Sequence, residues 1–267
     1  MGFVKTKEEI ARIQARLAEP RFLSAQLLTV QYLTRPEIVR HVLPPGLLPT
    51  EQPVATVMLG HWGRSNVCHA FSGACFYVQA RHKEHVGDYC LAMQMSTDAA
   101  IIFGREVFGE PKKYAKTTLE RSGSTLKGRV ERYGSPIIRI EATMQKKEPP
   151  TEGGFINFHY KFLPKCDGQG LEGDPVLVMA SFKTKPTLIE SGTATLALAN
   201  TVLDPLGEIE IVKVLGASYV EADTYSRCQA LERIEAEEFL PYAYSKNDDY
   251  AALDNEAEVP WGQVRVA

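Results

Sequence analysis

Residues 126–145 read LKGRVERYGSPIIRIEATMQ and consist of two alternating apolar and polar runs around a short polar centre. Alternation with a period of two indicates strands with one buried face. The centre, Tyr133-Gly134-Ser135-Pro136, carries the Gly and Pro typical of a tight turn. We therefore expect an antiparallel hairpin formed by Leu126–Tyr133 and Pro136–Gln145.

Similar strand patterns continue on both sides of this hairpin, without a long helix between them. This density favours an antiparallel sheet over alternating β-α-β units, so the fold class is mainly β, in the α+β sense. We expect one domain, 1–267, without an internal linker. Further strands are expected at Val54–Leu59, Ala74–Arg81, Tyr89–Met95, Phe155–Leu163, Leu177–Thr184, Thr193–Leu198 and Glu208–Tyr219.

Two short helices and a polar tail complete the prediction. Thr6 and Glu9 have the spacing of a capping box, which indicates an N-terminal helix over 6–18. A second helix is expected over Arg35–Val42, with Pro36 at an early position where its missing N–H costs nothing. The acidic tail, 245–267, is expected to be mobile.

The composition excludes several functional classes. The chain has 267 residues, a net charge of -3 and five cysteines in irregular spacing. The near-neutral charge gives no reason to expect nucleic-acid binding. An odd number of cysteines without a Cys-x-x-Cys pair argues against a disulfide framework and a structural zinc site. Without a signal peptide or an apolar run long enough to span a bilayer, we expect a cytoplasmic protein that does not bind membranes.

The segment 104–113, GREVFGEPKK, carries the strongest chemical signal. Successive side chains of an extended segment point in opposite directions, so Lys112 and Lys113 would face opposite sides. A lysine turned into the interior resists protonation, because burial disfavours the ammonium. Its neutral amine can attack a ketone and form an imine. From the dipeptide alone, a solvated surface pair is the other interpretation.

The segment resembles the active-site segment of the acetoacetate decarboxylase family, in which Gly-Arg-Glu is followed shortly by Pro-Lys-Lys. The resemblance extends over most of 24–244. It is carried also by Gly87-Asp88-Tyr89, Asp98-Ala99-Ala100-Ile101, Lys161-Phe162-Leu163-Pro164, Asp167-Gly168, Asp204-Pro205-Leu206-Gly207, Ile211-Val212, Ala217-Ser218 and Phe239-Leu240-Pro241.

The resemblance implies a fold and an activity. The fold is a closed antiparallel β-cone or barrel with surrounding strands and a few helices, assembled into homo-oligomers. Lys112 would form the Schiff base and Lys113 would be the neighbour that influences its pKa. Acetoacetate decarboxylase is itself the standard example of a lysine activated in this way. Arg105 and Glu106 match the motif; they would either hold the lysine segment or, for Arg105, contact the substrate directly. No metal or organic cofactor is expected.

The chain departs from the family at three site positions. Phe71 stands where the family has a glutamate, the strand near Thr56–Met58 lacks another, and the entrance arginine is absent near Ala25. An apolar Phe71 at the substrate cannot transfer protons. Replacement acid–base groups could be His61, His69 or Tyr242, and Gln94 could bind a carboxylate or carbonyl. Each of these side chains could instead be structural.

We therefore expect a cofactor-independent lyase that binds a small oxo acid at Lys112 and cleaves or forms a carbon–carbon bond. Decarboxylation and aldol chemistry with an aldehyde, followed by loss of water, both remain open. A non-catalytic small-molecule-binding protein on the same fold is the rival, because the acidic residues are missing.

Overall fold

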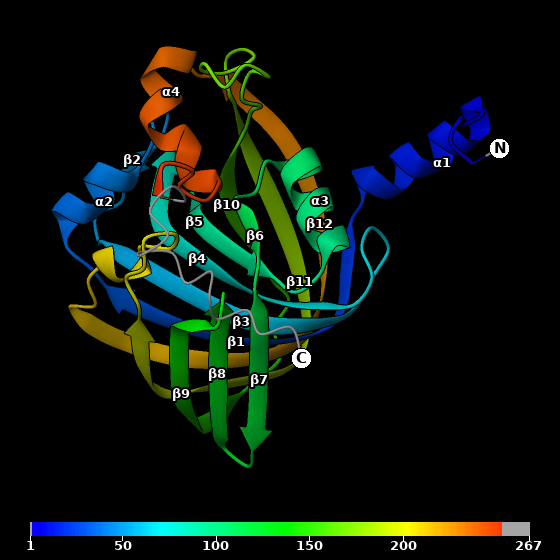
Figure 1. Ribbon diagram of the computed structural model, residues 1–267. Helices are drawn as coiled ribbons and strands as arrows, with labels where there is room; N and C mark the ends of the chain where they lie inside the picture. Colours follow the sequence, from blue (N-terminus) through cyan, green and yellow to red (C-terminus); the bar gives the residue numbers. More distant parts are fainter. Residues whose placement is uncertain (1, 253–267) are drawn as a thin grey trace.

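The computed structural model describes residues 2–252. Seven strands form a closed barrel in the order β10-β5-β4-β3-β1-β12-β11, and pairing of β10 with β11 closes the ring (Figure 1). All neighbours are antiparallel except β10 and β5, which run parallel. The prediction of a closed, mostly antiparallel barrel is confirmed. The seven strands are β1 (Arg21–Leu33), β3 (Val54–Ser65), β4 (Phe71–His82), β5 (His85–Met95), β10 (Gly153–Lys161), β11 (Val176–Leu198) and β12 (Lys213–Arg233).

A second group of strands extends from the far half of β11. There β11 pairs with β9 (Ser135–Glu148). Strand β9 pairs in turn with β8 (Thr125–Arg132), and β8 pairs with β7 (Lys116–Ser122). The predicted hairpin is β8 and β9. Tyr133 and Gly134 form its turn with φ values of 48° and 79°, as a two-residue turn matched to the strand twist requires.

The main apolar core lies where this extension packs against the barrel. Buried side chains of β8 and β9 join those of β1, β3 and β4 in one cluster, and β7 contacts β3, β4 and β5. A second cluster occupies the other face of the barrel strands and includes Trp62, Phe71 and Met93. Alternation along each strand therefore divides its side chains between two cores.

The segment that follows β5 positions the two lysines, Lys112 and Lys113. It contains α3 (Asp98–Phe103), a π-helical turn (Gly104–Phe108) and the short strand β6 (Lys112–Tyr114), which pairs in parallel with β5. Gly109 ends the helical part at φ 78°, and a Cβ there would lie 2.7 Å from the backbone of Lys161. Glycine is needed at this point for both reasons.

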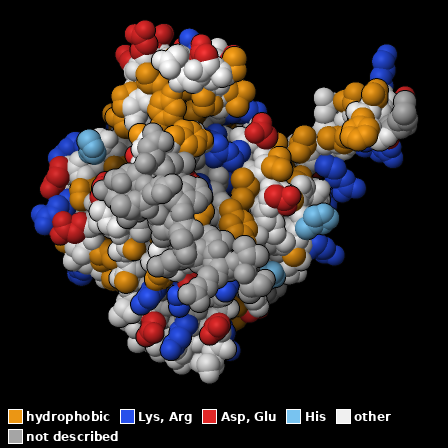
Figure 2. Space-filling model, in the orientation of Figure 1, with side chains coloured by type: hydrophobic (Ala, Val, Ile, Leu, Met, Phe, Trp, Pro, Cys, Tyr) orange, Lys and Arg blue, Asp and Glu red, His pale blue; other side chains and the backbone are white. Residues whose placement is uncertain are grey.

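The remaining helices lie at the periphery. They are α1 (Lys7–Ala18), α2 (Pro36–Val42) and α4 (Ala236–Ala243), with 3₁₀ turns at Leu206–Glu208 and Tyr244–Lys246, and β2 (Leu48–Pro49) pairs with β4. Thr6 and Glu9 form the predicted capping box of α1. This helix has no buried residue and projects from the body, with apolar side chains on its surface (Figures 1 and 2). Within residues 2–252, no helix is long and apolar enough to cross a membrane.

Some predicted boundaries were wrong. The strands expected at Leu177–Thr184 and Thr193–Leu198 are parts of one strand, β11, which passes through Pro186 with a register shift. The strand expected from Glu208 starts only at Lys213. Strands β1 and β7 and helices α3 and α4 were not predicted. In the predicted tail, the segment 245–252 contacts the body, and 253–267 lies outside the described residues.

Candidate active site

A small cavity of about 60 Å³ lies inside the barrel. Every one of the seven barrel strands contributes at least one side chain to its wall, which places the cavity in the barrel interior. The contributing side chains include Leu27 of β1, Met58 of β3, Tyr77 of β4, Met93 of β5, Asn157 of β10, Phe182 of β11 and Thr224 of β12. Most of the wall is apolar, and two charged residues, Glu110 and Lys112, complete it.

Lys112 and Glu110 form a buried ion pair at this cavity. Their side chains are 4% and 7% exposed, and Lys112 Nζ lies 2.7 Å from Glu110 Oε2. The same ammonium donates a hydrogen bond of 3.1 Å to the carbonyl of Ala100 in α3. It also lies 5.9 Å from the centre of the Phe71 ring. The amine thus has a charged partner, a carbonyl and an aromatic face in an environment without bulk water.

Local backbone geometry explains why these two side chains meet. They stand on either side of Pro111 in a tight three-residue turn. Glu110 N–H donates to the carbonyl of Gly104 at 3.0 Å, and Lys112 N–H donates to the carbonyl of Glu110 at 2.9 Å. Gly104 leaves the space that the pair occupies, because a Cβ there would lie 2.6 Å from Lys112 Nζ and collide with the Glu110 carboxylate.

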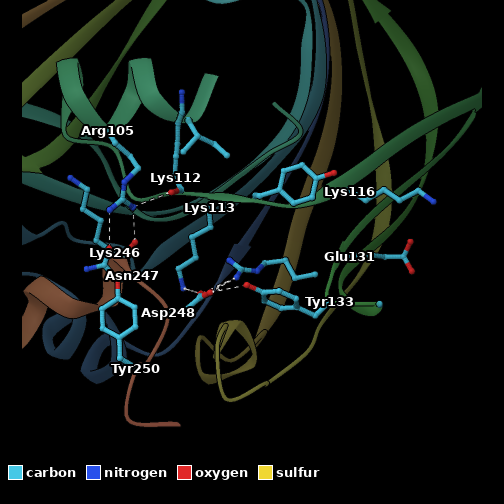
Figure 3. A pocket seen from close by; sticks show the side chains of 14 residues that line it. Arg105, Lys112, Lys113, Lys116, Glu131, Tyr133, Lys246, Asn247, Asp248 and Tyr250 are labelled. Carbon is cyan, nitrogen blue, oxygen red and sulfur yellow. Dashed lines mark hydrogen bonds and ion pairs between the residues drawn. The ribbon is translucent and has the colours of Figure 1, made fainter. Parts of the chain in front are cut away.

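Lys113 points to the opposite side of β6, as the alternation predicts (Figure 3). Its Nζ lies 3.1 Å from Asp248 Oδ1 and 3.6 Å from Asp204 Oδ1. Arg132 joins the same group at 3.1 Å from Asp204 and 2.8 Å from Asp248. The charge of Lys113 is therefore paired in this network, away from the Lys112 amine that it was expected to influence.

Arg105 links the lysine segment to the C-terminal segment. Its Nη1 donates to the backbone carbonyls of Lys112 at 3.1 Å and Lys246 at 3.0 Å, and its Nη2 donates to Asn247 Oδ1 at 2.8 Å (Figure 3). Of the two roles considered for Arg105, these contacts are those of a positioning residue. Glu106 is exposed and does not line the barrel cavity.

The proposed replacement acids do not reach the cavity. His61 and His69 are exposed, and His61 Nδ1 lies 3.1 Å from Ser72 Oγ. Tyr242 lies on α4, beside Phe239, and lines a separate cavity of about 820 Å³ on the Lys113 side. The structure therefore does not bring these three side chains to Lys112.

Gln94 also faces away from the cavity. It alternates along β5 with Met93 and Met95, which both line the cavity, so its side chain lies on the other face of the sheet. It is fully buried, and neither amide atom has a protein partner. Phe71, in contrast, lines the cavity and stacks on Trp62 with ring centres 4.7 Å apart.

Sequence reasoning missed three polar features near the amine: a carboxylate, a hydrogen-bonded pair and a histidine. Glu110 is one. Asn157 and Tyr77 form a buried pair, in which Asn157 Nδ2 donates to the Tyr77 hydroxyl at 3.2 Å. Burial raises the pKa of Tyr77 well above its usual value, so its hydroxyl stays neutral. The spacing of Glu110 and Lys112 was a visible signal, whereas Asn157 and Tyr77 meet only through strand pairing.

His159 is the third missed group. It lies two residues after Asn157 on β10, is 1% exposed, and neither ring nitrogen has a protein partner. Burial lowers its pKa to about 4, so the ring is neutral at neutral pH. Glu110 and Lys112 act electrostatically on it, which places it near the ion pair without a direct contact.

Comparisons with known proteins agree with this architecture. The acetoacetate decarboxylase of Burkholderia ambifaria is 27% identical over 210 residues, which cover 76% of this chain and 84% of that protein. A solved acetoacetate decarboxylase from Legionella pneumophila superposes with a TM-score of 0.72 at 21% identity, covering 80% of this chain and 87% of that one.

The enduracididine biosynthesis enzyme MppR, solved with pyruvate, superposes with a TM-score of 0.62 at 16% identity over 83% of this chain and 90% of that one. At such identities the two solved structures establish the fold alone. The model of the family described as acetoacetate decarboxylase matches residues 7–235, most of the chain. With this match, the common fold and a buried lysine in the Pro-Lys-Lys motif, the protein belongs to the acetoacetate decarboxylase family.

Proposed function

We propose that the protein is a cofactor-independent carbon–carbon lyase that forms an imine between Lys112 and a small carbonyl substrate. The observation that carries the proposal is the Lys112–Glu110 pair, 2.7 Å apart at the wall of a cavity inside the barrel. An amine must lose its proton before it attacks a carbonyl, and a carboxylate at this distance can accept that proton. The names of the relatives, acetoacetate decarboxylases and an enzyme that binds pyruvate, support imine chemistry on a carbonyl carbon.

The reaction would begin with proton transfer from Lys112 to Glu110. The neutral Nζ then attacks the carbonyl carbon, a C–N bond forms, and the C=O electron pair moves to oxygen. That oxygen takes one proton from Nζ and the other from Glu110 and leaves as water, which gives an iminium ion and the Glu110 carboxylate. The hydroxyl of Tyr77, held by Asn157, is a neutral donor at the same wall and would stabilise the charge that develops on oxygen.

The iminium then accepts the electrons of the breaking carbon–carbon bond and becomes an enamine. In a decarboxylation the departing group is carbon dioxide; in a retro-aldol cleavage it is an aldehyde. In a retro-aldol cleavage the Glu110 carboxylate would take the proton of the substrate hydroxyl and pass it to the enamine carbon; in a decarboxylation that proton would come from water. Water would then hydrolyse the resulting iminium to release the product and the free lysine. In the retro-aldol path each proton that the carboxylate takes up is passed on, so the carboxylate ends in its starting state. It would replace the acids that are missing at Phe71 and near Met58.

Reductive trapping tests the proposal. The protein is incubated with borohydride and each of several small carbonyl compounds, and the adduct is located by peptide mass spectrometry. We expect an adduct on Lys112, none on that position in Lys112→Arg, and unchanged trapping in Lys116→Arg, which alters an exposed lysine four residues away. An adduct that forms at equal rates in all three proteins would reject Lys112 as the nucleophile.

One observation favours the rival, a small-molecule-binding protein. The Glu110 carboxylate lies at ion-pair distance from the Lys112 ammonium, and an ammonium cannot form an imine. If carbonyl compounds bind to the cavity in equilibrium experiments but borohydride traps none of them, binding without turnover is the better description.

A further inference from the structure

We infer that the barrel cavity selects an uncharged carbonyl substrate, such as a β-hydroxy ketone, rather than an oxo acid. This inference rests on the proposed function, because it concerns the compound that Lys112 attacks. It also decides between the two kinds of bond cleavage. A neutral hydroxy ketone can undergo retro-aldol cleavage but has no carboxylate to lose.

The charges at the cavity carry the argument. Within residues 2–252, Lys112 is the sole cationic side chain of the cavity wall, and Glu110 already balances its charge. Ala25, near which the family's arginine was expected, is buried among apolar neighbours. His159 lies near the pair but is neutral, because burial lowers its pKa to about 4. Lys246 interacts electrostatically with Glu110, but it lines the neighbouring pocket together with Arg105 and is not part of this wall. An arriving carboxylate would therefore find no unpaired cation on the cavity wall.

The two substrate classes differ in the charge that they bring. With a neutral substrate the site carries no net charge at any stage, since first the ammonium and then the iminium balances the Glu110 carboxylate. An oxo acid adds a second carboxylate next to the first, in a space from which water is largely excluded. Burial of an unpaired charge and repulsion between like charges both oppose its binding.

The neutral polar groups of the wall fit a hydroxyl group better than a carboxylate. Asn157 Oδ1 is buried and accepts no hydrogen bond from the protein, and Thr224 adds a hydroxyl to the same wall. An unpaired acceptor requires a donor, which a substrate hydroxyl supplies and a carboxylate lacks. The rest of the wall consists of aromatic rings and methionines such as Met58 and Met95, which suit the carbon skeleton.

The cavity also limits the substrate to a small compound. Its volume of about 60 Å³ is far below the roughly 300–1,000 Å³ of pockets that take drug-sized ligands. Flexible methionine side chains can move to admit a few more atoms. In the cleavage of a hydroxy ketone bound as an iminium, a base takes the hydroxyl proton and the new C=O forms as the Cα–Cβ bond breaks. Its electrons move to the iminium nitrogen, the aldehyde departs, and protonation and hydrolysis of the enamine release the ketone.

Matched acids and esters test the inference. Rates of borohydride trapping at Lys112 are measured for acetoacetate against methyl acetoacetate, and for pyruvate against methyl pyruvate. For each compound, the trapping rate at Lys112 is divided by the rate at which borohydride traps the same compound on a free alkylamine. This ratio removes the difference in intrinsic carbonyl reactivity between acid and ester. We expect the normalised ester rates to exceed those of the acids at least tenfold, although each ester is larger than its acid. Equal or faster trapping of the acids would overturn the inference and leave the imine proposal intact.

Two further measurements complete the design. In Glu110→Gln, which removes the negative charge, the ester-to-acid ratio should fall several-fold whatever happens to the absolute rates; an unchanged ratio would contradict the charge argument. The unmodified protein should cleave 4-hydroxypentan-2-one to acetone and acetaldehyde faster than it decarboxylates acetoacetate, and the reverse order would overturn the inference. Absence of any adduct on Lys112, with all four compounds, would reject the proposed function itself.

Discussion

Replacement of one member of the Lys112–Glu110 pair should destabilise the protein far more than replacement of both. Each side chain is less than a tenth exposed, so a single substitution, Glu110→Met or Lys112→Met, leaves the other group buried without its partner. Such a loss typically costs about 3–5 kcal/mol, whereas exchange of a whole buried pair for apolar residues is often neutral or stabilising. For a chain of this size about 1 kcal/mol shifts Tm by roughly 2–4 °C, so each single variant should melt about 10 °C lower.

Urea unfolding at pH 7 of the parent, both single variants and the double variant gives the coupling free energy between the two positions. The matched control is the pair Lys146 and Glu148 on β9, which has the same residue types and spacing and a distance of 2.9 Å, but whose side chains are 71% and 31% exposed. We expect a coupling of about 3 kcal/mol or more at 110 and 112, and below about 1 kcal/mol at 146 and 148. Equal coupling in the two cycles would refute the claim that the site is desolvated.

Three further variants test how the site is held together. Gly104→Ala should abolish trapping at Lys112, because its Cβ would occupy the space of the ion pair, whereas Gly173→Ala, where a Cβ meets nothing within 4 Å, should react like the parent. Arg105→Leu removes the bonds to the Lys112 and Lys246 carbonyls, and displacement of the nucleophile should slow trapping roughly tenfold to a hundredfold; Arg105→Lys should recover part of the rate if the residue positions the lysine, and an unchanged rate would exclude that role. His159 has a pKa of about 4, below the value of about 6.5 of an unfolded chain. The unfolded state thus binds more protons between these values, and folding stability should fall by up to about 3 kcal/mol as the pH drops from 7 to 4. His159→Leu should lose less stability than the parent over the same range in denaturant titrations, and equal losses would show that the ring does not titrate in this way.

The barrel was predictable from the sequence because local patterns and family resemblance agreed. Alternation indicated β8 and β9, and their turn residues take the positive φ values that such turns require. The same reasoning divided β11 into two strands, because Pro186 interrupts the apolar pattern. In the structure, pairing with β10, β12 and β9 on its two edges holds β11 together as one strand. Such long-range pairing leaves no trace in a local window.

The site was predictable only where it depends on local geometry. Alternation correctly separated Lys112 from Lys113. Glu110 meets Lys112 through the tight turn at Pro111, which follows from local sequence as well. The histidines at 61 and 69 were chosen by their closeness in sequence to the altered positions. In a barrel, however, the face on which a side chain lies depends on strand register. Asn157 and His159 reach the interior through the pairing of β10 with β5 and β11.

The position of the carboxylate has a mechanistic consequence beyond proton transfer. A substitution or a shift of a barrel strand can displace an acid on that strand without displacing the nucleophile. Glu110, in contrast, lies in the same tight backbone turn as Lys112, so the positions of the two side chains are coupled. The distance between acid and amine is then fixed by Pro111 and by the space at Gly104, and not by the packing of the wall. The opposite wall, with Met58 and Phe71, is free to change with the substrate. Imine formation and substrate choice would therefore depend on separate elements, and wall substitutions should alter which carbonyl compound reacts while Lys112 remains trappable.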